Sequence, residues 1–188
     1  FADGAFAAAQ FNPPRGLSVA GNRLYVADTG NHRIREVDLG AWAVTTIAGT
    51  GERGSYDTSE HTPARSAGLA SPWDVELIDG GKTLAIANAG THQILAYDIA
   101  AKTVSVLAGS GREGIDDGKA HKAALAQPSG LSASGGSLFF ADAESSALRI
   151  LHNGVVKTLI GTGLFDFGLR DGVYPQAMMQ HPQGLYAD

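Results

Sequence analysis

The chain has 188 residues and no cysteine, which excludes disulfides, thiolate nucleophiles and zinc–thiolate sites within it. Its formal net charge is −5, and its 14 Lys and Arg residues are scattered, so it lacks the basic stripe or patch that nucleic-acid-binding proteins usually have, and no nucleic-acid partner is expected. The composition is 44% apolar but has no apolar run of the roughly 18 residues that span a bilayer, which predicts a soluble globular protein without a membrane partner.

The first strongly patterned segment covers residues 24–38 and reads as strand, tight turn, strand. An apolar run ends in Ala27-Asp28, turn-forming residues follow, and residues 33–37 alternate between polar and apolar. Related segments return at residues 84–98 and 138–149. A repeat protein is therefore the first conclusion.

A proline sets the phase of the repeat. It opens each unit at spacings of 58, 56 and 54 residues, at Pro14, Pro72, Pro128 and Pro182. A Gly-x-Gly ends each full unit, at residues 49–51, 109–111 and 161–163. The predicted blades therefore cover residues 14–51, 72–111 and 128–163, and residues 182–188 begin the next blade.

Each unit contains four strand-like runs joined by hairpin-length turns. Four antiparallel strands every 50 to 60 residues are typical of a propeller blade. The expected fold is all-β: three four-stranded antiparallel blades plus the first strand of a fourth.

Three blades are fewer than the four to eight of a closed propeller. Two interpretations follow: the chain is a fragment of a larger propeller, or two copies form a homodimer that closes a six-bladed ring. We favour the fragment, because residues 1–20 align without a gap on residues 169–188, and no closing strand is supplied.

The pattern Pro-x-Gly-Leu, then residues 24–35, then Thr-Ile-Ala-Gly-Thr-Gly resembles the NHL repeat. It is strong in the first blade and weaker in the third, where Ser145-Ser146 replaces Asn31-His32. The chain is also similar, in order along its length, to proteins that combine thioredoxin-like and NHL domains. Segments that carry this similarity include residues 71–75, 89–94, 108–111, 126–132 and 180–182.

The resemblance implies a larger protein with an N-terminal thioredoxin-like domain, a six-bladed NHL propeller and a C-terminal β domain. The present residues would supply about half of that propeller. The resemblance also favours a cytoplasmic setting, although the residues themselves leave the compartment open. No cofactor is expected.

The repeated turn contains Asn31 and His32 in the first unit and His92 in the second. Histidines at one phase could form a ring of metal ligands. Because Ser146 occupies the third position, we instead expect these side chains to bond to backbone and fix the hairpin, with no metal.

A polar residue closes the second strand of each unit, at Asp28, Asn88 and Asp142. A carboxylate or amide there can accept hydrogen bonds from turn N–H groups, so we expect structural caps. The acids of Asp3-Gly4 and Asp116-Asp117-Gly118 resemble pieces of a calcium loop but lack its spacing. We expect solvated turns at these two places.

Positions that differ between repeats are better candidates for function. Trp73 stands where the other units have Arg15, Ser129 and Gln183, at the entry to an inner strand, and Asp74 follows it. Trp73 and Asp74 could line a binding surface, since exposed Trp contributes strongly to binding; the alternative is that Trp73 packs between blades. Arg15, Glu144 and His181 are further candidates by the same reasoning.

No recognisable catalytic motif is present, so we predict a non-catalytic scaffold that binds a protein or a small molecule through inter-blade loops. The alternative is a metal-dependent propeller enzyme of the lactonase or lyase type, for which Asp74 and Glu76 are the inner-strand acids. A third interpretation is an assembly domain that positions a neighbouring redox domain.

Overall fold

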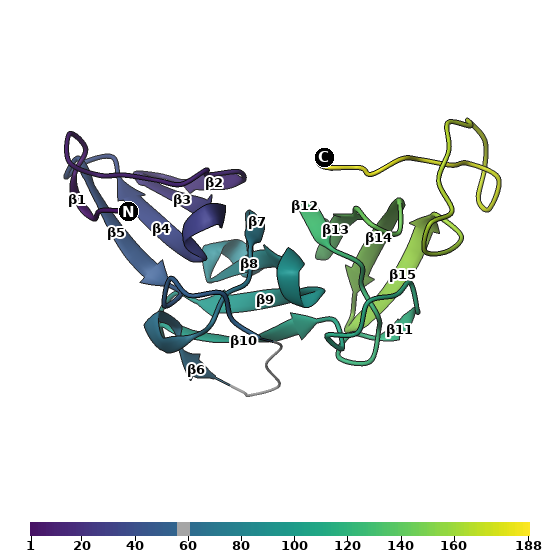
Figure 1. The fold of residues 1–188 in the computed structure, drawn as a ribbon, viewed down its shortest axis with the longest axis horizontal. Helices are drawn as coiled ribbons and strands as arrows, with labels where there is room; N and C mark the ends of the chain where they lie inside the picture. Colours follow the sequence, from purple (N-terminus) through teal and green to yellow (C-terminus); the bar gives the residue numbers. More distant parts are fainter. Residues whose placement is uncertain (56–60) are drawn as a thin grey trace.

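A computed structural model describes residues 1–55 and 61–188 and shows an all-β chain. Its strands form three antiparallel sheets of five strands each (Figure 1). The first sheet has the order β1 (Gly4–Ala5), β5 (Ala43–Ala48), β4 (Arg33–Asp38), β3 (Arg23–Asp28), β2 (Leu17–Ala20). The second has the order β6 (Thr62–Pro63), β10 (Thr103–Ala108), β9 (Gln93–Asp98), β8 (Thr83–Asn88), β7 (Pro72–Ile78). The third has the order β11 (Gly118–Lys119), β15 (Val155–Ile160), β14 (Ala147–His152), β13 (Ser137–Asp142), β12 (Pro128–Ser134).

The prediction of four strands per blade was wrong by one strand. The loop before each blade returns along its outer edge and adds the two-residue strand β1, β6 or β11, as in the pairing of Gly4 with Val44. A two-residue strand has no alternating pattern, so the sequence could not reveal it. The added strand covers part of an edge that would otherwise expose unpaired backbone groups.

The expected first strand of a fourth blade is not assigned as a strand at residues 182–188. This segment nevertheless lies beside β12, because Ala187 N donates to Ser132 Oγ at 3.0 Å. The bond reaches a side chain rather than a backbone carbonyl, so no strand ladder forms.

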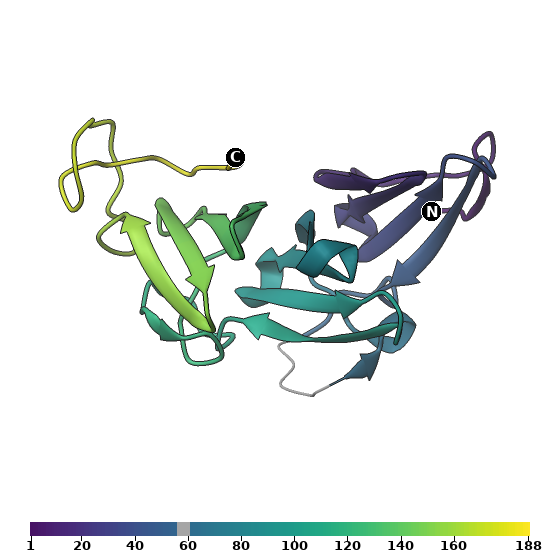
Figure 2. The same ribbon diagram turned by 180° about the vertical axis from the view of Figure 1, so that it is seen from behind.

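The three sheets follow one another in an open arc with the inner strands β2, β7 and β12 on its concave side (Figure 1). The outermost strands β1, β6 and β11 lie on the convex side, and the opposite view shows the same order (Figure 2). Within the described residues, no helix has the length and apolar character needed to cross a bilayer.

The core lies between successive sheets. Alternate residues of each strand face opposite neighbours, so Tyr25 and Ile34 of the first sheet pack with Leu84 and Tyr97 of the second. A second cluster joins the second and third sheets around residues such as Phe140. Each blade therefore depends on its neighbours to bury its apolar faces.

Candidate functional site

The residue after the opening proline comes to one end of the inner strands in every repeat. Arg15, Trp73, Ser129 and Gln183 surround a cavity of about 260 Å³ there, together with Gly16 and Asp74. The inner strands approach closely at this end, where Gly16 N donates to the carbonyl of Trp73 at 2.9 Å. The structure thus brings together three of the predicted binding residues, Arg15, Trp73 and Asp74.

Trp73 is only partly buried, and its ring lies beneath the guanidinium of Arg15, with 4.3 Å from Cζ to the ring centroid. It also lines a second cavity of about 180 Å³ with Arg53, His92 and Gln127. Its aromatic surface therefore borders two hollows at the same end of the molecule. The stacking on exposed Arg15 is a cation–π contact that orients the guanidinium.

Asp74 is partly buried, and its carboxylate accepts two backbone hydrogen bonds. Oδ2 accepts from Leu131 N of the next blade at 2.7 Å, and Oδ1 accepts from Val75 N at 2.9 Å. Burial nevertheless raises the pKa of Asp74 to about 6, because desolvation outweighs these two donors. A Cβ at Gly16 would lie 1.8 Å from Asp74 Oδ1, so this carboxylate requires glycine at position 16.

The second inner-strand acid, Glu76, also bonds across blades. Its Oε1 accepts from Ala133 N at 3.1 Å, and its Oε2 accepts from Ser18 Oγ at 3.3 Å. Ser18 has the same place one blade earlier, where its Oγ accepts from Leu77 N at 3.3 Å. Asp74 and Glu76 therefore tie neighbouring inner strands together. No group of three or more His, Asp or Glu residues in the described ranges is arranged to hold a metal ion.

Glu144 and His181 lie apart from these two cavities, since neither residue is among those that line them. They form a pair of their own, with 3.9 Å between Glu144 Oε2 and His181 Nε2. The candidates proposed from the sequence thus separate into two groups.

The turn residues His32, His92 and Ser146 all have left-handed backbone, with φ of 51°, 55° and 50°. His32 Nδ1 accepts from Ser71 N at 3.0 Å, and His92 Nδ1 accepts from Gln127 N at 3.3 Å. Ser146 Oγ likewise accepts from His181 N at 3.3 Å. Each donor immediately precedes the next opening proline, so these bonds join blades, whereas the sequence predicted bonds within one hairpin.

Replacing His32 with alanine should lower the free energy of unfolding by about 1 kcal/mol, because Ser71 N loses its acceptor. Burial and the nearby Arg53 lower the pKa of His32, which keeps Nδ1 free to accept at neutral pH. Urea denaturation measures the loss. His32→Ser should restore part of it, since Ser146 accepts the equivalent bond; equal stability of His32→Ala and wild type would contradict this role.

The strand-closing residues bind the loop that enters their own blade. Asp28 Oδ1 accepts from Asn12 N at 2.8 Å, Asn88 Oδ1 from Ala70 N at 2.9 Å, and Asp142 Oδ1 from Ala126 N at 2.8 Å. The expected acceptor role is present, but the donors lie 16 to 18 residues upstream instead of in the following turn. In the first blade Asn31 Nδ2 also donates to Asp28 Oδ2 at 2.9 Å.

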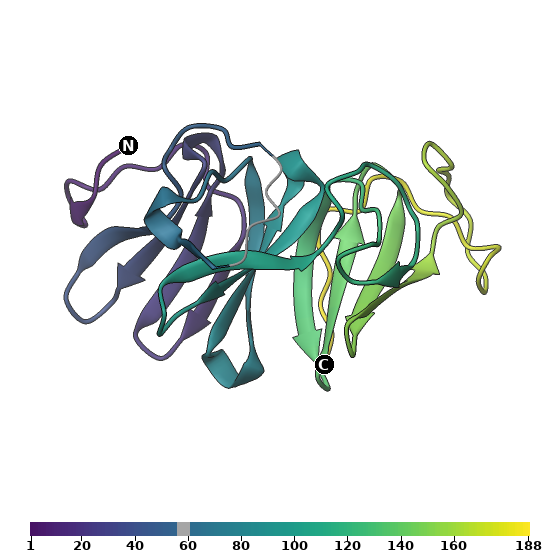
Figure 3. The ribbon, with the colours of Figure 1, turned by 90° about the horizontal axis from the view of Figure 1, so that it is seen from below.

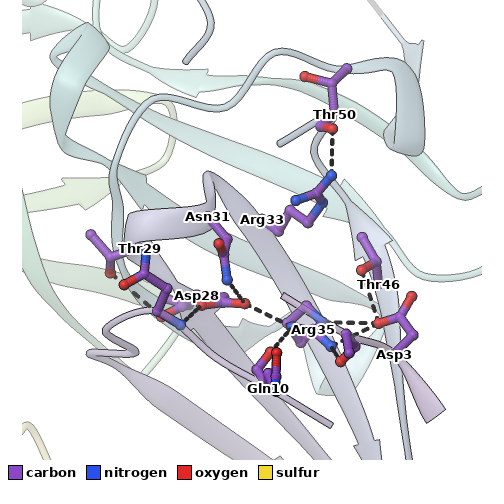
Figure 4. A network of polar contacts seen from close by, with 12 residues as sticks. Asp3, Gln10, Asp28, Thr29, Asn31, Arg33, Arg35, Thr46 and Thr50 are labelled. Atoms are coloured by element: carbon purple, nitrogen blue, oxygen red, sulfur yellow. Dashed lines mark hydrogen bonds and ion pairs between the residues drawn. The ribbon is translucent and has the colours of Figure 1, made fainter. Parts of the chain in front are cut away.

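Two buried arginines complete this arrangement and were not singled out from the sequence. Arg35 Nη1 lies 2.8 Å from Asp28 Oδ2, and both side chains are 0% exposed (Figure 4). Arg35 also binds Asp3 at 2.8 Å and the carbonyl of Gln10 at 3.0 Å. Asp3 is thus a ligand of a buried arginine, which corrects its prediction as part of a solvated turn.

The third blade repeats this geometry. Arg149 Nη1 lies 2.9 Å from Asp142 Oδ2, again with both side chains 0% exposed, and Arg149 Nη2 reaches Asp117 Oδ1 at 3.1 Å. In the second blade Asn88 and Leu95 occupy the two positions. The sequence did contain a signal for this buried pair. Two repeats have an Asp and an Arg seven residues apart, and the second repeat replaces both residues.

A proline at or shortly before each inner strand, capped second strands and turns that bond to the next blade define a repeat protein built of propeller-type sheets. The NHL repeat model matches residues 11–36. NHL repeat-containing protein 2 from Homo sapiens is 40% identical over 215 residues, covering 99% of this chain and 30% of that protein. The chain is an NHL repeat protein, homologous to NHL repeat-containing protein 2 over essentially its whole length and corresponding to part of that larger protein.

A plant relative and a solved structure extend the comparison. Protein SUPPRESSOR OF QUENCHING 1, chloroplastic, from Arabidopsis thaliana is 39% identical over 199 residues, covering 98% of this chain and 19% of that protein. The crystal structure of an auxiliary nutrient binding protein from Bacteroides ovatus ATCC 8483 has a TM-score of 0.68 and 19% identity, and the match covers 94% of this chain and 43% of that one. The latter likeness is one of fold alone.

Proposed function

We propose that the chain is a non-catalytic scaffold, part of a larger thioredoxin-like/NHL protein, that binds a partner at the end of the inner strands lined by Arg15 and Trp73. The observation that carries this proposal is the variation at one repeated position. Arg15, Trp73, Ser129 and Gln183 share a place after the opening proline and line one cavity, yet all four differ. The fold tolerates four different side chains at this position. The stability of the fold therefore does not explain why Trp73 and Arg15 lie side by side.

The exposed groups suggest the chemistry of the partner. Asp74 and Glu76 accept hydrogen bonds from the neighbouring blades, whereas Arg15 is exposed and its guanidinium stacks on the face of Trp73. A guanidinium offers paired donors to a carboxylate, and Trp73 offers an aromatic surface beside it. A protein segment with a carboxylate next to an apolar or planar group fits this arrangement best, and a small molecule with the same two groups would fit it too.

A displayed peptide library selected against the chain tests this proposal. We expect enrichment of peptides that combine an acidic and an apolar or aromatic residue, and a loss of affinity of at least about tenfold in Trp73→Ala and in Arg15→Ala. Trp42→Ala is the matched control, because Trp42 is the other tryptophan, is 66% exposed, and packs on Phe6. Thermal unfolding confirms that each variant remains folded.

Two results would overturn the proposal. Selected peptides could bind Trp73→Ala and Arg15→Ala as tightly as wild type, which would place their site elsewhere. Alternatively, Trp42→Ala could weaken binding as much as Trp73→Ala, which would indicate general adhesion to exposed apolar side chains.

A further inference from the structure

A separate cavity of about 530 Å³ lies between the second and third sheets. Its apolar lining consists of Leu77, Ile78, Leu107, Ala133, Leu138 and Leu151, and all of these except Leu77 belong to the packed cluster between the second and third sheets. Ile78 is the last residue of β7 and Trp73 is near its start, so the two sites are separated by roughly 17 Å of extended strand. The hairpin turns that border this cavity lie along the lower side of Figure 3.

A comparison of the repeats explains why this interface is hollow. Between the first and second sheets, Tyr25, Leu77 and Tyr97 belong to the packed cluster, and the two tyrosines are 5% and 4% exposed. The equivalent positions between the second and third sheets hold smaller residues: Ala85, Ala133 and Leu151. Ala133 and Leu151 line the cavity, so the smaller side chains at these two positions leave room that Leu77 and Tyr97 occupy at the other interface.

The lining indicates the class of ligand. Leu138 and Leu151 are 4% and 8% exposed, so they lie at the bottom of the hollow. The rim consists of tight turns at η3 (Asp79–Gly81) and at residues 134–137 and 153–154. Among the described residues of the lining, Asp79 is the one that carries a charge, and it lies exposed on the rim.

We propose that this cavity binds a compact, uncharged molecule with an aromatic or branched aliphatic body. Its volume falls in the range of small-molecule sites, roughly 300–1,000 Å³. Its apolar side chains are joined by the polar side chains of Asp79, Ser134, Ser137 and Asn153 on the rim, and such a mixture is typical of these sites. A flat protein surface would meet the turns of the rim before it reached Leu138 and Leu151. The site is distinct from the Arg15–Trp73 end and does not depend on the binding proposed there.

Indole is a suitable probe, and the methyl NMR signals of the chain provide the readout. We expect saturable shifts concentrated in the methyl groups of Ile78, Leu138 and Leu151. Ala133→Leu introduces the residue that the second blade has at the equivalent position, Leu77. Because the larger side chain fills part of the cavity, this variant should weaken indole binding at least tenfold. It should also raise the melting temperature by roughly 2–4 °C, as filling a cavity does.

Leu151→Tyr, which introduces the residue that the second blade has at Tyr97, is the second filling variant in case Ala133→Leu does not fold. Trp42→Phe is an exposed control. Undiminished indole binding in a folded filling variant would overturn the proposal. Shifts that spread equally to Leu17 and Val19, which are 60% exposed, would overturn it as well. Loss of indole binding in Trp73→Ala would place the probe at the other end of the inner strands and reject the cavity site.

Discussion

Replacing Arg149 with leucine should lower the free energy of unfolding by about 3–5 kcal/mol. The substitution leaves the carboxylate of Asp142, which is 0% exposed and lies 2.9 Å from Arg149 Nη1, without its counter-charge. The carbonyl of Ala124 also loses a donor at 2.7 Å. Urea denaturation followed by circular dichroism measures the loss.

A second substitution should recover most of that loss. Asp142→Asn together with Arg149→Leu recreates the pair Asn88 and Leu95 of the second blade, where the asparagine still accepts from the entering loop at 2.9 Å. The double variant should therefore be more stable than Arg149→Leu alone. It would retain the acceptor for Ala126 N and remove the buried charge.

The control is an exposed ion pair of the first sheet. Arg23 contacts Glu36 at 2.6 Å with its own side chain 47% exposed, so Arg23→Leu should cost no more than about 1 kcal/mol. If the double variant is as unstable as Arg149→Leu, the loss comes from packing and not from the unpaired charge.

The stability of the wild-type chain relative to Asp74→Asn should rise as the pH falls from 7 to 4, by up to about 3 kcal/mol. Burial raises the pKa of Asp74 from 3.8 to about 6, so the folded state binds this proton more tightly than the unfolded state does. The stabilisation is complete below the unfolded pKa, near 4, and is lost as the pH rises through 6. About half of it should be present at pH 5.

The difference between the two proteins is the quantity to measure, because other carboxylates also titrate in this range. Asparagine at position 74 can accept only one of the two backbone bonds from Val75 and Leu131. The missing bond should lower the unfolding free energy of Asp74→Asn, and the amide itself adds no pH dependence because it does not titrate in this range. A difference in unfolding free energy that does not change between pH 7 and pH 4.5 would show that the carboxylate does not retain its proton on folding.

Much of the architecture could be predicted from the sequence, because a repeat shows its own phase. The opening prolines, the alternating strands and the turn around Asn31 and His32 predicted an all-β repeat protein of the NHL type. The sequence also identified the position of Trp73 and Arg15 as a candidate binding position. The residue there differs between repeats, whereas the proline before it recurs. That the two side chains stack was not predictable, because their contact depends on how two blades pack.

The sequence by itself determined the longer strands of the three repeats, where they turn, and which residues are equivalent between repeats, but not the two-residue strands β1, β6 and β11. Only the tertiary structure decided the partners across blades, as when His32 bonds to Ser71 and Asp74 bonds to Leu131. It also revealed buried Arg35 and Arg149 and the cavity lined by Ala133 and Leu151. The physical reason is that strand pattern depends on neighbours along the chain, whereas charge burial and cavity volume depend on residues some 30 to 60 positions away that packing brings together.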